Sequence, residues 1–312
     1  PNQFPYDNQI GSVYDCGEFD RLLTRALEMS DYNHFEQRRQ ESLKNNKLRG
    51  IGLAYFLEAS GAGTAPKDQV IGQFTQDGVL RIFAVTGASG QGHETSFSQI
   101  VHEKIGLAND HVEFVAGQTD KMMIGSGTGG SRTLYGAGSA VMNLCEQILE
   151  KSKPLAAQVL NVAESQLEFS NGVWQHRESN QTLSISQLVQ KTFIQDLPHS
   201  LNLTGEASSG ATYPNGCHIA EVEIDPDTGV TEIIQYTAVD DVGVAISPTL
   251  VQGQIHGGIV QGIGQAFYEQ AIYDASGQLL TGSYMDYAMP KVGCLMNIQT
   301  EKIQVPTKNN IL

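Results

Sequence analysis

The chain has 312 residues, of which 40% are hydrophobic and 33 are glycine, and its formal net charge is −15 at pH 7. A chain of this length can bury a substantial core and is expected to divide into about two lobes. The acidic balance argues against a nucleic-acid partner, because phosphate backbones are bound by basic surfaces. No run approaches the roughly 18 apolar residues of a membrane-spanning helix.

The spacing of apolar residues predicts helices and strands in mixed order, so the fold class that we expect is α+β. Two helices are expected between residues 19 and 44. Strands are expected at 49–59, 69–73 and 79–85. The last of these strands is apolar apart from Arg81, which is typical of a mostly buried strand. A further helix is expected from the helical spacing of Phe97, Ile100, Val101 and Ile105.

Two hairpins are expected in the second half of the chain. Asn171-Gly172 is the strongest short turn signal in the sequence and predicts the first hairpin. The alternating strand 218–225 predicts one arm of the second hairpin, and Pro226-Asp227-Thr228-Gly229 turns it into a strand at 230–239.

A boundary between two lobes is expected near the polar stretch 200–210. This stretch is rich in serine and glycine, which is typical of a loop between structured segments. We therefore expect two lobes of mixed sheet and helices, a first lobe at 1–205 and a second lobe at 206–312.

The segment 87–95, Gly-Ala-Ser-Gly-Gln-Gly-His-Glu-Thr, lies between an expected strand and an expected helix. Glycines let backbone N–H groups approach a phosphate closely, and a helix start adds unpaired donors and a partial positive charge. The segment therefore predicts an anion site. The alternative is that it only connects two elements, as many glycine-rich turns do.

Two further segments have the same character. Residues 125–133, Gly-Ser-Gly-Thr-Gly-Gly-Ser-Arg-Thr, run into a helix-like stretch, and the hydroxyl groups of Thr128, Ser131 and Thr133 could all donate to one anion. The segment 252–265 follows Ser247-Pro248, a typical helix start. Its five glycines should weaken a helix by roughly 1 kcal/mol each relative to alanine. We expect these glycines to admit neighbouring backbone or a flat ligand.

These segments do not match the common nucleotide or hydrolase motifs. None ends in the Gly-Lys-Ser/Thr of a phosphate-binding P-loop, and the Rossmann glycine spacing is absent. A serine hydrolase is not expected, because the Gly-x-Ser-x-Gly elbow is missing. The ligand is therefore not expected to be ATP or NAD held in the usual way.

The cysteines and histidines do not predict a metal site in this chain. The cysteines are isolated, with no Cys-x-x-Cys pair, so neither a zinc site nor an iron–sulfur cluster is expected. No histidine pair has the three- or four-residue spacing of a zinc site. Reduced thiols and a cytoplasmic setting are expected for Cys16, Cys145, Cys217 and Cys294.

Several separated motifs together resemble the molybdopterin-binding large subunit of the xanthine dehydrogenase, aldehyde oxidase and aerobic carbon monoxide dehydrogenase family of molybdenum hydroxylases. The motifs are Arg-Gly-Ile-Gly-Leu-Ala at 49–54, Gly-Gln-Gly-His-Glu-Thr at 90–95, Gly-Ser-Arg-Thr at 130–133, Tyr-Pro-Asn-Gly-Cys-His at 213–218 with 221–225, and the segment 252–264. The resemblance covers essentially the whole chain and looks closest to the bacterial branch with separate subunits. It implies the fold of the second molybdenum-cofactor-binding domain, with glycine-rich cofactor loops.

The resemblance also implies that the chain is the C-terminal half of such a subunit. The family's N-terminal portion, which carries a glycine- and phenylalanine-rich loop near the metal, has no counterpart in this sequence. Residues 305–312 resemble a family segment shortly before the catalytic glutamate, which we expect to lie beyond Leu312. No catalytic residue and no metal ligand are therefore assigned here, and the isolated chain is expected to be inactive.

The chemistry implied by the resemblance is that of an oxidoreductase. It hydroxylates an aldehyde or an N-heterocycle, or oxidises carbon monoxide, with water as the oxygen source. The implied cofactor is molybdenum-molybdopterin in the cytosine dinucleotide form, with iron–sulfur clusters and FAD on partner subunits. Two copies of this three-subunit assembly, related by two-fold symmetry, give a dimer of heterotrimers. The alternative is a non-catalytic cofactor-binding or interaction fragment.

Residues near the pterin are assigned from the resemblance. Gln91 is placed at the pterin region near the metal, with backbone donors at Gly90 and Gly92. Gln254 is placed on its helix with a hydrogen bond to the cofactor. These contacts are typical of a protein that holds a large anionic cofactor by many hydrogen bonds.

Residues near the phosphates are assigned in the same way. Thr128, Ser131 and Thr133 are placed at the pyranopterin phosphate. Arg132 is a candidate partner for the second phosphate of a dinucleotide, because its guanidinium is a planar fork of donors. The alternative for Arg132 is a buried structural salt bridge, for which arginine is the usual choice.

Two acidic motifs have structural alternatives. Asp240-Asp241 could orient a ligand at a strand end, although such a pair more often caps the following turn. Asp286 and Tyr287 lie in a run that resembles a family segment near the substrate side, and structural packing is the alternative that we favour.

Overall fold

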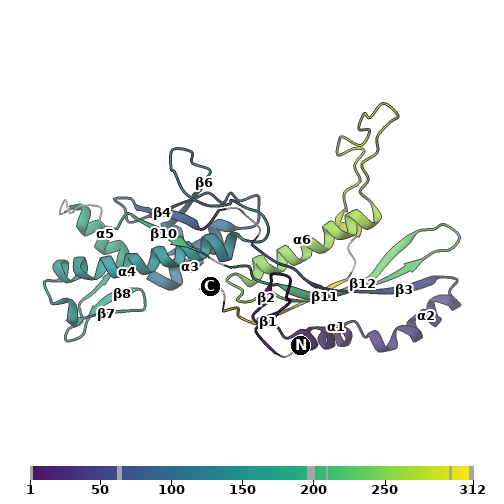
Figure 1. The fold of residues 1–312 in the computed structure, drawn as a ribbon, viewed down its shortest axis with the longest axis horizontal. Helices are drawn as coiled ribbons and strands as arrows, with labels where there is room; N and C mark the ends of the chain where they lie inside the picture. Colours follow the sequence, from purple (N-terminus) through teal and green to yellow (C-terminus); the bar gives the residue numbers. More distant parts are fainter. Residues whose placement is uncertain (1–2, 62–64, 195–200, 209, 295–296, 309–312) are drawn as a thin grey trace. The chain divides into compact units, whose positions relative to one another are not determined.

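The computed structural model describes residues 3–61, 65–194, 201–208, 210–294 and 297–308. The chain forms two compact units (Figure 1). Unit 1 comprises residues 1–58 and 213–306, and unit 2 comprises residues 59–212 and 307–312. Within the described ranges, no helix has both the length and the apolar composition needed to cross a membrane.

Unit 1 is built on a four-stranded sheet in the order β13-β12-β11-β3. Its strands are β3 (Leu48–Leu57), β11 (Asn215–Ile224), β12 (Thr231–Asp241) and β13 (Ile298–Ile303). β11 is antiparallel to both β3 and β12, whereas β12 and β13 run parallel. The short strands β1 (Tyr6–Asp7) and β2 (Val13–Tyr14) pair with each other in a separate sheet.

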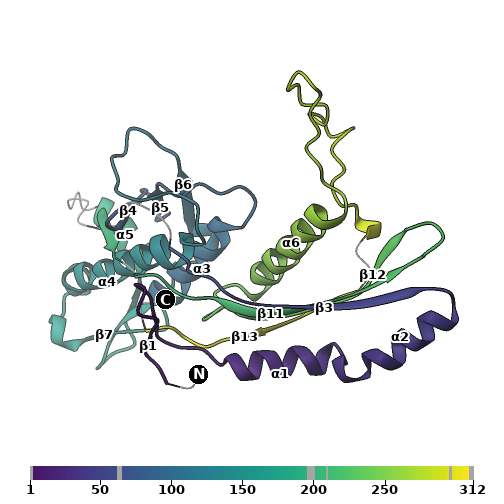
Figure 2. The same ribbon diagram turned by 45° about the vertical axis from the view of Figure 1, so that its right-hand side comes forward.

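Helices cover both faces of the four-stranded sheet of unit 1 (Figure 2). α1 (Phe19–Met29) and α2 (Phe35–Lys44) lie along one face and are connected through the 3-10 helix η1 (Tyr32–His34). α6 (Pro248–Phe267) lies against the other face. A second 3-10 helix of this unit, η5 (Val292–Cys294), precedes β13.

Each face of this sheet has its own apolar cluster. On one face, α1 contributes Leu22 and Ala26, which are packed with Cys217, Ile219, Val239 and Ile303. On the other face, α6 contributes Ile259 and Ile263, which are packed with Ala238. Ala238 and Val239 are neighbours on β12 yet belong to different clusters, because successive residues of a strand point to opposite faces.

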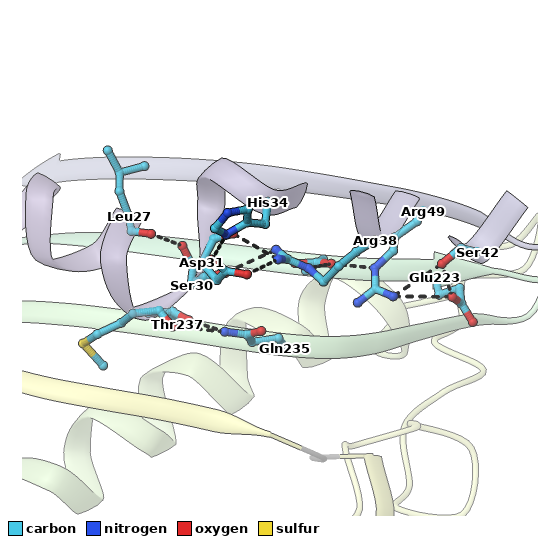
Figure 3. A network of polar contacts seen from close by, with 12 residues as sticks. Leu27, Ser30, Asp31, His34, Arg38, Ser42, Arg49, Glu223, Gln235 and Thr237 are labelled. Atoms are coloured by element: carbon cyan, nitrogen blue, oxygen red, sulfur yellow. Dashed lines mark hydrogen bonds and ion pairs between the residues drawn. The ribbon is translucent and has the colours of Figure 1, made fainter. Parts of the chain in front are cut away.

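A buried carboxylate ties α2 to the sheet of unit 1. Glu221 of β11 is 1% exposed and accepts hydrogen bonds from Arg38 Nη2 at 2.8 Å and from Arg49 Nε at 2.5 Å. Figure 3 shows Arg38 and Arg49 converging on this region, with Ser42 and Glu223 beside Arg49. Burial acts to raise the pKa of Glu221, but the two arginines outweigh it and hold that pKa below its usual value.

Unit 2 contains a four-stranded sheet in the order β10-β4-β5-β6 and a separate three-stranded sheet. The first consists of β4 (Asp68–Phe74), β5 (Leu80–Ala84), β6 (Val112–Ala116) and β10 (Leu203–Ala207). The second consists of β7 (Leu167–Ser170), β8 (Val173–His176) and β9 (Thr182–Ser184). β5 and β6 run parallel, and α3 (His93–Ile105) lies in the crossover between them.

The long helix α4 (Ser139–Leu160) organises the core of unit 2. It packs against α3, β4 and β10, and it also contacts α5 (Ile185–Ile194). Gly72 of β4 permits this close approach, since a Cβ there would come within 2.7 Å of the Leu144 side chain. A π-helical turn, η3 (Leu134–Gly138), leads into α4. Further short helices of this unit are η2 (Asn109–His111) and η4 (Glu164–Gln166).

The predicted fold class and both predicted hairpins are confirmed. Asn171 and Gly172 join β7 to β8 with φ angles of 50° and 77°, the left-handed conformation that a tight hairpin turn requires. β11 and β12 form the second hairpin. The strand predicted around Arg81 is β5, in which only Arg81 is exposed.

The compact units do not follow the predicted boundary between residues 205 and 206. β3 is hydrogen-bonded along its length to β11, so residues 1–58 join the unit that contains 213–306. β10 pairs with β4 and therefore stays in unit 2. The predicted linker 200–210 coincides in part with β10, and its residues 200 and 209 lie outside the described residues.

Candidate functional site

The first glycine-rich segment forms loop A, residues 87–92, between β5 and α3. Gly90 and Gly92 have φ angles of 100° and 78°, which side-chain-bearing residues rarely adopt. The Oε1 atom of Gln91 accepts a hydrogen bond from the Ser89 N–H at 2.5 Å. The carboxamide oxygen of Gln91 therefore holds the turn, while its amide nitrogen is left as a donor.

Loop A leads directly into the N-terminus of α3. Gly92 is the residue before the helix, and the first backbone bond of this turn runs from the Ser96 N–H to the Gly92 carbonyl at 3.1 Å. The backbone N–H groups from Gly90 to Thr95 donate to no other group in the described part of the chain. A helix N-terminus with unpaired donors and a favourable dipole is suited to an anion.

The second glycine-rich segment forms loop B, residues 125–133, ahead of η3. Gly127, Gly130 and Ser131 have φ angles of 69°, 60° and 54°. Within the described ranges, no backbone N–H from Gly127 to Ser131 donates to a protein group, and neither does the exposed Ser131 hydroxyl. Successive N–H groups in left-handed conformations form concave anion-binding surfaces.

Hydrogen bonds between hydroxyl groups hold loops A and B together. The Thr128 hydroxyl donates to the Gly87 carbonyl at 2.7 Å. Thr86, directly before loop A, lies with its Oγ1 atom 2.6 Å from Thr128 Oγ1 and 3.1 Å from Thr133 Oγ1. The structure therefore brings together two of the three predicted segments within unit 2.

A buried ion pair fastens loop B to β4. Arg132 is 7% exposed, and its Nη2 atom lies 2.5 Å from Asp68 Oδ2. A Cβ at Gly136 would come within 2.6 Å of the same carboxylate, so only glycine lets η3 pass this close. Arg132 thus forms the structural salt bridge that the sequence left as the alternative to phosphate binding. A role for Arg132 at a second phosphate stays a prediction.

The third predicted segment forms α6 in unit 1, with Ser247 before its first residue as predicted. Gln254 is exposed on this helix. A Cβ at Gly253, Gly257, Gly258 or Gly262 would meet no atom of the described structure within 4 Å. The helix therefore has an open glycine surface beside Gln254, which fits the predicted approach of a flat ligand. That Gln254 shares a ligand with loops A and B stays a prediction.

Sequence reasoning missed Thr86 and gave His93 no role. Thr86 is 3% exposed, and the signal that could have found it is a hydroxyl residue directly after a buried apolar strand. Burial lowers the pKa of His93, against a hydrogen bond to the Thr86 backbone that raises it. The His93 ring lies against Phe97 and Phe114, with ring centroids 5.9 and 6.2 Å apart. A neutral imidazole therefore supports the end of loop A.

The acidic motifs make hydrogen bonds within the protein, and a ligand role for them stays a prediction. Asp240 Oδ1 lies 3.0 Å from His218 Nε2. Asp241 caps the turn after β12, where its Oδ1 atom accepts from the Gly243 N–H at 3.1 Å. Asp286 accepts from the Ser283 hydroxyl at 2.7 Å, and the Tyr287 hydroxyl donates to Glu269 at 2.9 Å.

Cys145 and Cys217 are free thiols, and the Sγ atom of Cys16 lies 3.8 Å from the Val305 carbonyl oxygen. Burial raises the pKa of the Cys145 thiol to about 12, so this residue is an unreactive core thiol. Burial also raises the pKa of Cys217. The side chain of Cys294 lies outside the described residues.

Comparison with known proteins places this geometry in a family. The family described as "Molybdopterin cofactor-binding domain" matches residues 25–295, which is most of the chain. The chain belongs to this family. The resemblance inferred from the separated motifs is thereby confirmed, and loops A and B are loops of a molybdopterin cofactor-binding domain.

Relatives and solved structures agree with this assignment. The nicotine 6-hydroxylase large subunit of Paenarthrobacter nicotinovorans is 31% identical over 98% of this chain and 40% of that subunit. The carbon monoxide dehydrogenase large chain of Afipia carboxidovorans is 30% identical over 93% of this chain and 38% of that chain. The chain thus spans about 40% of the length of these curated relatives.

The fold is likewise that of known molybdenum enzymes. A crystal structure of Cu,Mo-CO dehydrogenase matches with a TM-score of 0.86 and 28% identity, over 99% of this chain and 42% of that one. Quinoline 2-oxidoreductase from Pseudomonas putida 86 matches with a TM-score of 0.85 and 29% identity, over the same shares.

The residues of loops A and B fit an anionic cofactor. Unpaired backbone N–H groups at 90–95 and 127–131 provide many donors at one place in unit 2. A Cβ at Gly90, Gly127 or Gly129 would meet no described atom within 4 Å, so the loop surface is open beside these donors. Neutral donors at glycine-rich turns are typical of phosphate sites.

Proposed function

We propose that this chain is part of the large subunit of a molybdenum hydroxylase and holds the phosphate-bearing part of its molybdopterin cofactor through loops A and B. The main support is the pair of unpaired donor runs, 90–95 and 127–131, which hydroxyl bonds hold together. Arg132 is 7% exposed and its Nη2 atom bonds to Asp68, so we propose that the backbone donors of the two runs carry most of the binding. This arrangement suits an acidic chain that recognises an anion by geometry rather than by a basic surface.

The individual roles proposed within this site follow from the groups that each residue leaves unpaired. Gln91 uses its oxygen inside loop A, so its amide nitrogen is the group proposed for the pterin. Gly90 and Gly92 contribute backbone donors, and Ser131 contributes both its N–H and its hydroxyl. Gln254, exposed on α6, is proposed as a further cofactor contact.

The reaction proposed for the whole subunit is oxidative hydroxylation of an aldehyde or an N-heterocycle, or oxidation of carbon monoxide, with water as the oxygen source. When bound, the cofactor supplies the molybdenum centre at which the substrate is oxidised. The named relatives include a nicotine hydroxylase, a quinoline oxidoreductase and carbon monoxide dehydrogenases, which supports this range of substrates. The catalytic glutamate is proposed to come from the remainder of the subunit.

The assembly proposed around this chain follows from the electron path. Electrons that leave the cofactor need an acceptor, and this sequence has no cluster-ligating cysteine spacing and no dinucleotide fingerprint. We therefore propose an iron–sulfur subunit and an FAD subunit as partners, in a cytoplasmic dimer of heterotrimers. One relative is named as a subunit of a dehydrogenase complex, which supports a multi-subunit assembly.

The test is the cofactor content of the purified complex that contains this chain. Molybdenum is measured by mass spectrometry, the pterin by the fluorescence of its oxidised form, and cytidine monophosphate after acid hydrolysis. We expect all three in stoichiometric amounts. Absence of a pterin and of molybdenum would contradict cofactor binding, whereas a pterin without cytidine monophosphate would contradict only the dinucleotide form.

A matched pair of variants tests whether loop B holds the phosphate. Ser131→Asp introduces a negative charge beside the donor run, and Ser131→Asn is its neutral counterpart. Both residues tolerate the left-handed φ of 54° better than most others. We expect the Asp variant to lose most of the cofactor and the Asn variant to retain it. Equal cofactor content in the two variants would contradict an anion site at loop B.

A further inference from the structure

The hydroxyl groups of Thr86, Thr128 and Thr133 form a chain of hydrogen bonds behind loops A and B. Thr86 Oγ1 lies 2.6 Å from Thr128 Oγ1 and 3.1 Å from Thr133 Oγ1. Thr128 Oγ1 also lies 2.7 Å from the Gly87 carbonyl oxygen. This series of hydrogen bonds thus contacts loop A at Gly87 and loop B at Thr128 and Thr133.

The number of available protons fixes which hydroxyl donates in each of these hydrogen bonds. A hydroxyl has one proton to donate, and a carbonyl oxygen can only accept. Thr128 donates to the Gly87 carbonyl, so the Thr86 hydroxyl must donate to Thr128. Thr133 must then donate to Thr86, whose own proton is already used.

The protons of Thr128 and Thr133 are therefore used within the protein. In this arrangement neither hydroxyl can donate to a phosphate unless the chain of bonds is broken. The donors that remain are the backbone N–H groups of 127–131 and the hydroxyl of Ser131.

We propose that Thr86 is a positioning residue, which sets the spacing between loops A and B for the phosphate of the ligand, with Thr128 and Thr133 as its partners rather than as phosphate donors. This inference rests on the proposed function for the identity of the ligand. The spacing itself is a property of the protein and can be tested without any ligand.

The position of Thr86 suits this role. It is 3% exposed and lies two residues after the end of β5, so the sheet holds its backbone in place. A threonine side chain has few χ1 rotamers, which limits the directions that its hydroxyl can take. One residue thus connects the end of β5 to Thr128 and Thr133 of loop B.

The first test uses amide hydrogen exchange of the full chain, without ligand, to measure how firmly loops A and B are held in place. Thr86→Val keeps the shape of the side chain and removes its hydroxyl, and Thr86→Ser restores the hydroxyl. Loss of the bonds to Thr128 and Thr133 should raise exchange about tenfold in Thr86→Val at the hydrogen-bonded amides in and beside the two loops, those of Ser89, Ser96 and Gly136. Thr86→Ser should stay close to the wild type.

Thr192→Val is the matched control for these variants. Thr192 is a buried threonine on α5 of the same unit, and its hydroxyl donates to the Val189 carbonyl within its own helix. Its loss should leave exchange in loops A and B unchanged. Equal loop exchange in Thr86→Val and the wild type would overturn the proposal, whether or not the chain binds an anion.

The second test measures the consequence for binding, with inorganic pyrophosphate as the probe and phosphorus NMR as the readout. Thr86→Val should weaken pyrophosphate binding about tenfold, and Thr86→Ser should restore it to within about threefold of the wild type. Faster exchange with unchanged pyrophosphate affinity would show a purely structural hydroxyl and overturn the positioning role. A wild-type chain that does not bind pyrophosphate would contradict the proposed function, and the exchange result would still decide the spacing.

Discussion

Arg132 and Asp68 form an ion pair in the interior of unit 2, with 2.5 Å between Nη2 and Oδ2 and less than a tenth of each residue exposed. The pair connects loop B, which presents its donors at 127–131, to the first residue of β4. Gly125 and Gly136 both pack against the same carboxylate. The conformation of the proposed phosphate loop thus depends on a charge pair that faces the core.

Removal of one charge from this pair should be costly. Asp68→Asn removes the carboxylate charge that pairs with the buried guanidinium of Arg132, and breaking such a pair costs about 3–5 kcal/mol. The free energy of unfolding of unit 2, measured with urea, should fall by that amount. Arg81 and Glu113 form a matched exposed pair, 2.6 Å apart with half of each side chain exposed. Glu113→Gln should cost less than about 1 kcal/mol, because water screens this pair.

The buried carboxylate of unit 1 predicts a pH-dependent stability. Burial raises the pKa of Glu221, but hydrogen bonds from Arg38 and Arg49 outweigh this and leave the pKa below its usual value of 4.5. The stabilisation is therefore fully present above the unfolded-state pKa and is lost as the pH falls through the lower folded-state pKa.

Glu221→Gln tests this dependence. It should lower the free energy of unfolding of unit 1 by about 3–5 kcal/mol at neutral pH, because both arginines lose a buried counter-charge. The difference from the wild type should shrink as the pH is lowered below 4.5, measured by urea unfolding at a series of pH values. A difference that is constant with pH would contradict an ionised Glu221.

A third prediction concerns a single carboxylate that NMR can follow. Lys47 Nζ lies 2.6 Å from Asp225 Oδ2, and this bond, with N–H donors at Asp227 and Thr228, lowers the pKa of Asp225 to about 2. In Lys47→Met the pKa should rise towards 3.8 without reaching it, since the two N–H donors remain. Lys44→Met is the control, because Lys44 pairs with Glu41, and the pKa of Asp225 should not change there.

A fourth prediction tests the role of Gln254. Gln254→Leu changes an exposed side chain of α6, so the thermal stability should change little. The cofactor content of the purified complex should fall if Gln254 contacts the cofactor as proposed. Gln252→Leu is the control, because Gln252 is also exposed and points about 160° away from Gln254 around the helix. Equal cofactor content in both variants would remove Gln254 from the proposed site.

The local signals in the sequence predicted much of this fold. The glycine pattern of loops A and B, the turn at Asn171 and the proline at the start of α6 each depend on a backbone requirement of a single segment. Such requirements can be read from a few adjacent residues. The compact units could not be read in this way, because the pairing of β3 with β11 joins residues far apart in the chain.

Thr86 and Arg132 show the same limit within the site. The fragment Thr-Gly-Ala gives no sign that Thr86 reaches two hydroxyls about 45 residues later, since only the folded sheet brings loop B to that position. Arg132 was a candidate for a phosphate because its guanidinium is a planar fork of donors, with a buried salt bridge as the alternative. Its partner in the salt bridge, Asp68, is 64 residues away and carries no sequence signal of that contact, and the phosphate role stays a prediction.

The amide resonances of loops A and B offer the most direct test of anion binding by this chain. Pyrophosphate is added to the nitrogen-15-labelled chain, and the shift of each backbone N–H is followed, with sodium chloride at equal ionic strength as the reference. Unpaired donors that close on a phosphate should move strongly, so the largest shifts are expected at 90–95 and 127–131. Large shifts confined to other segments, with these two runs unchanged, would contradict the proposed phosphate site.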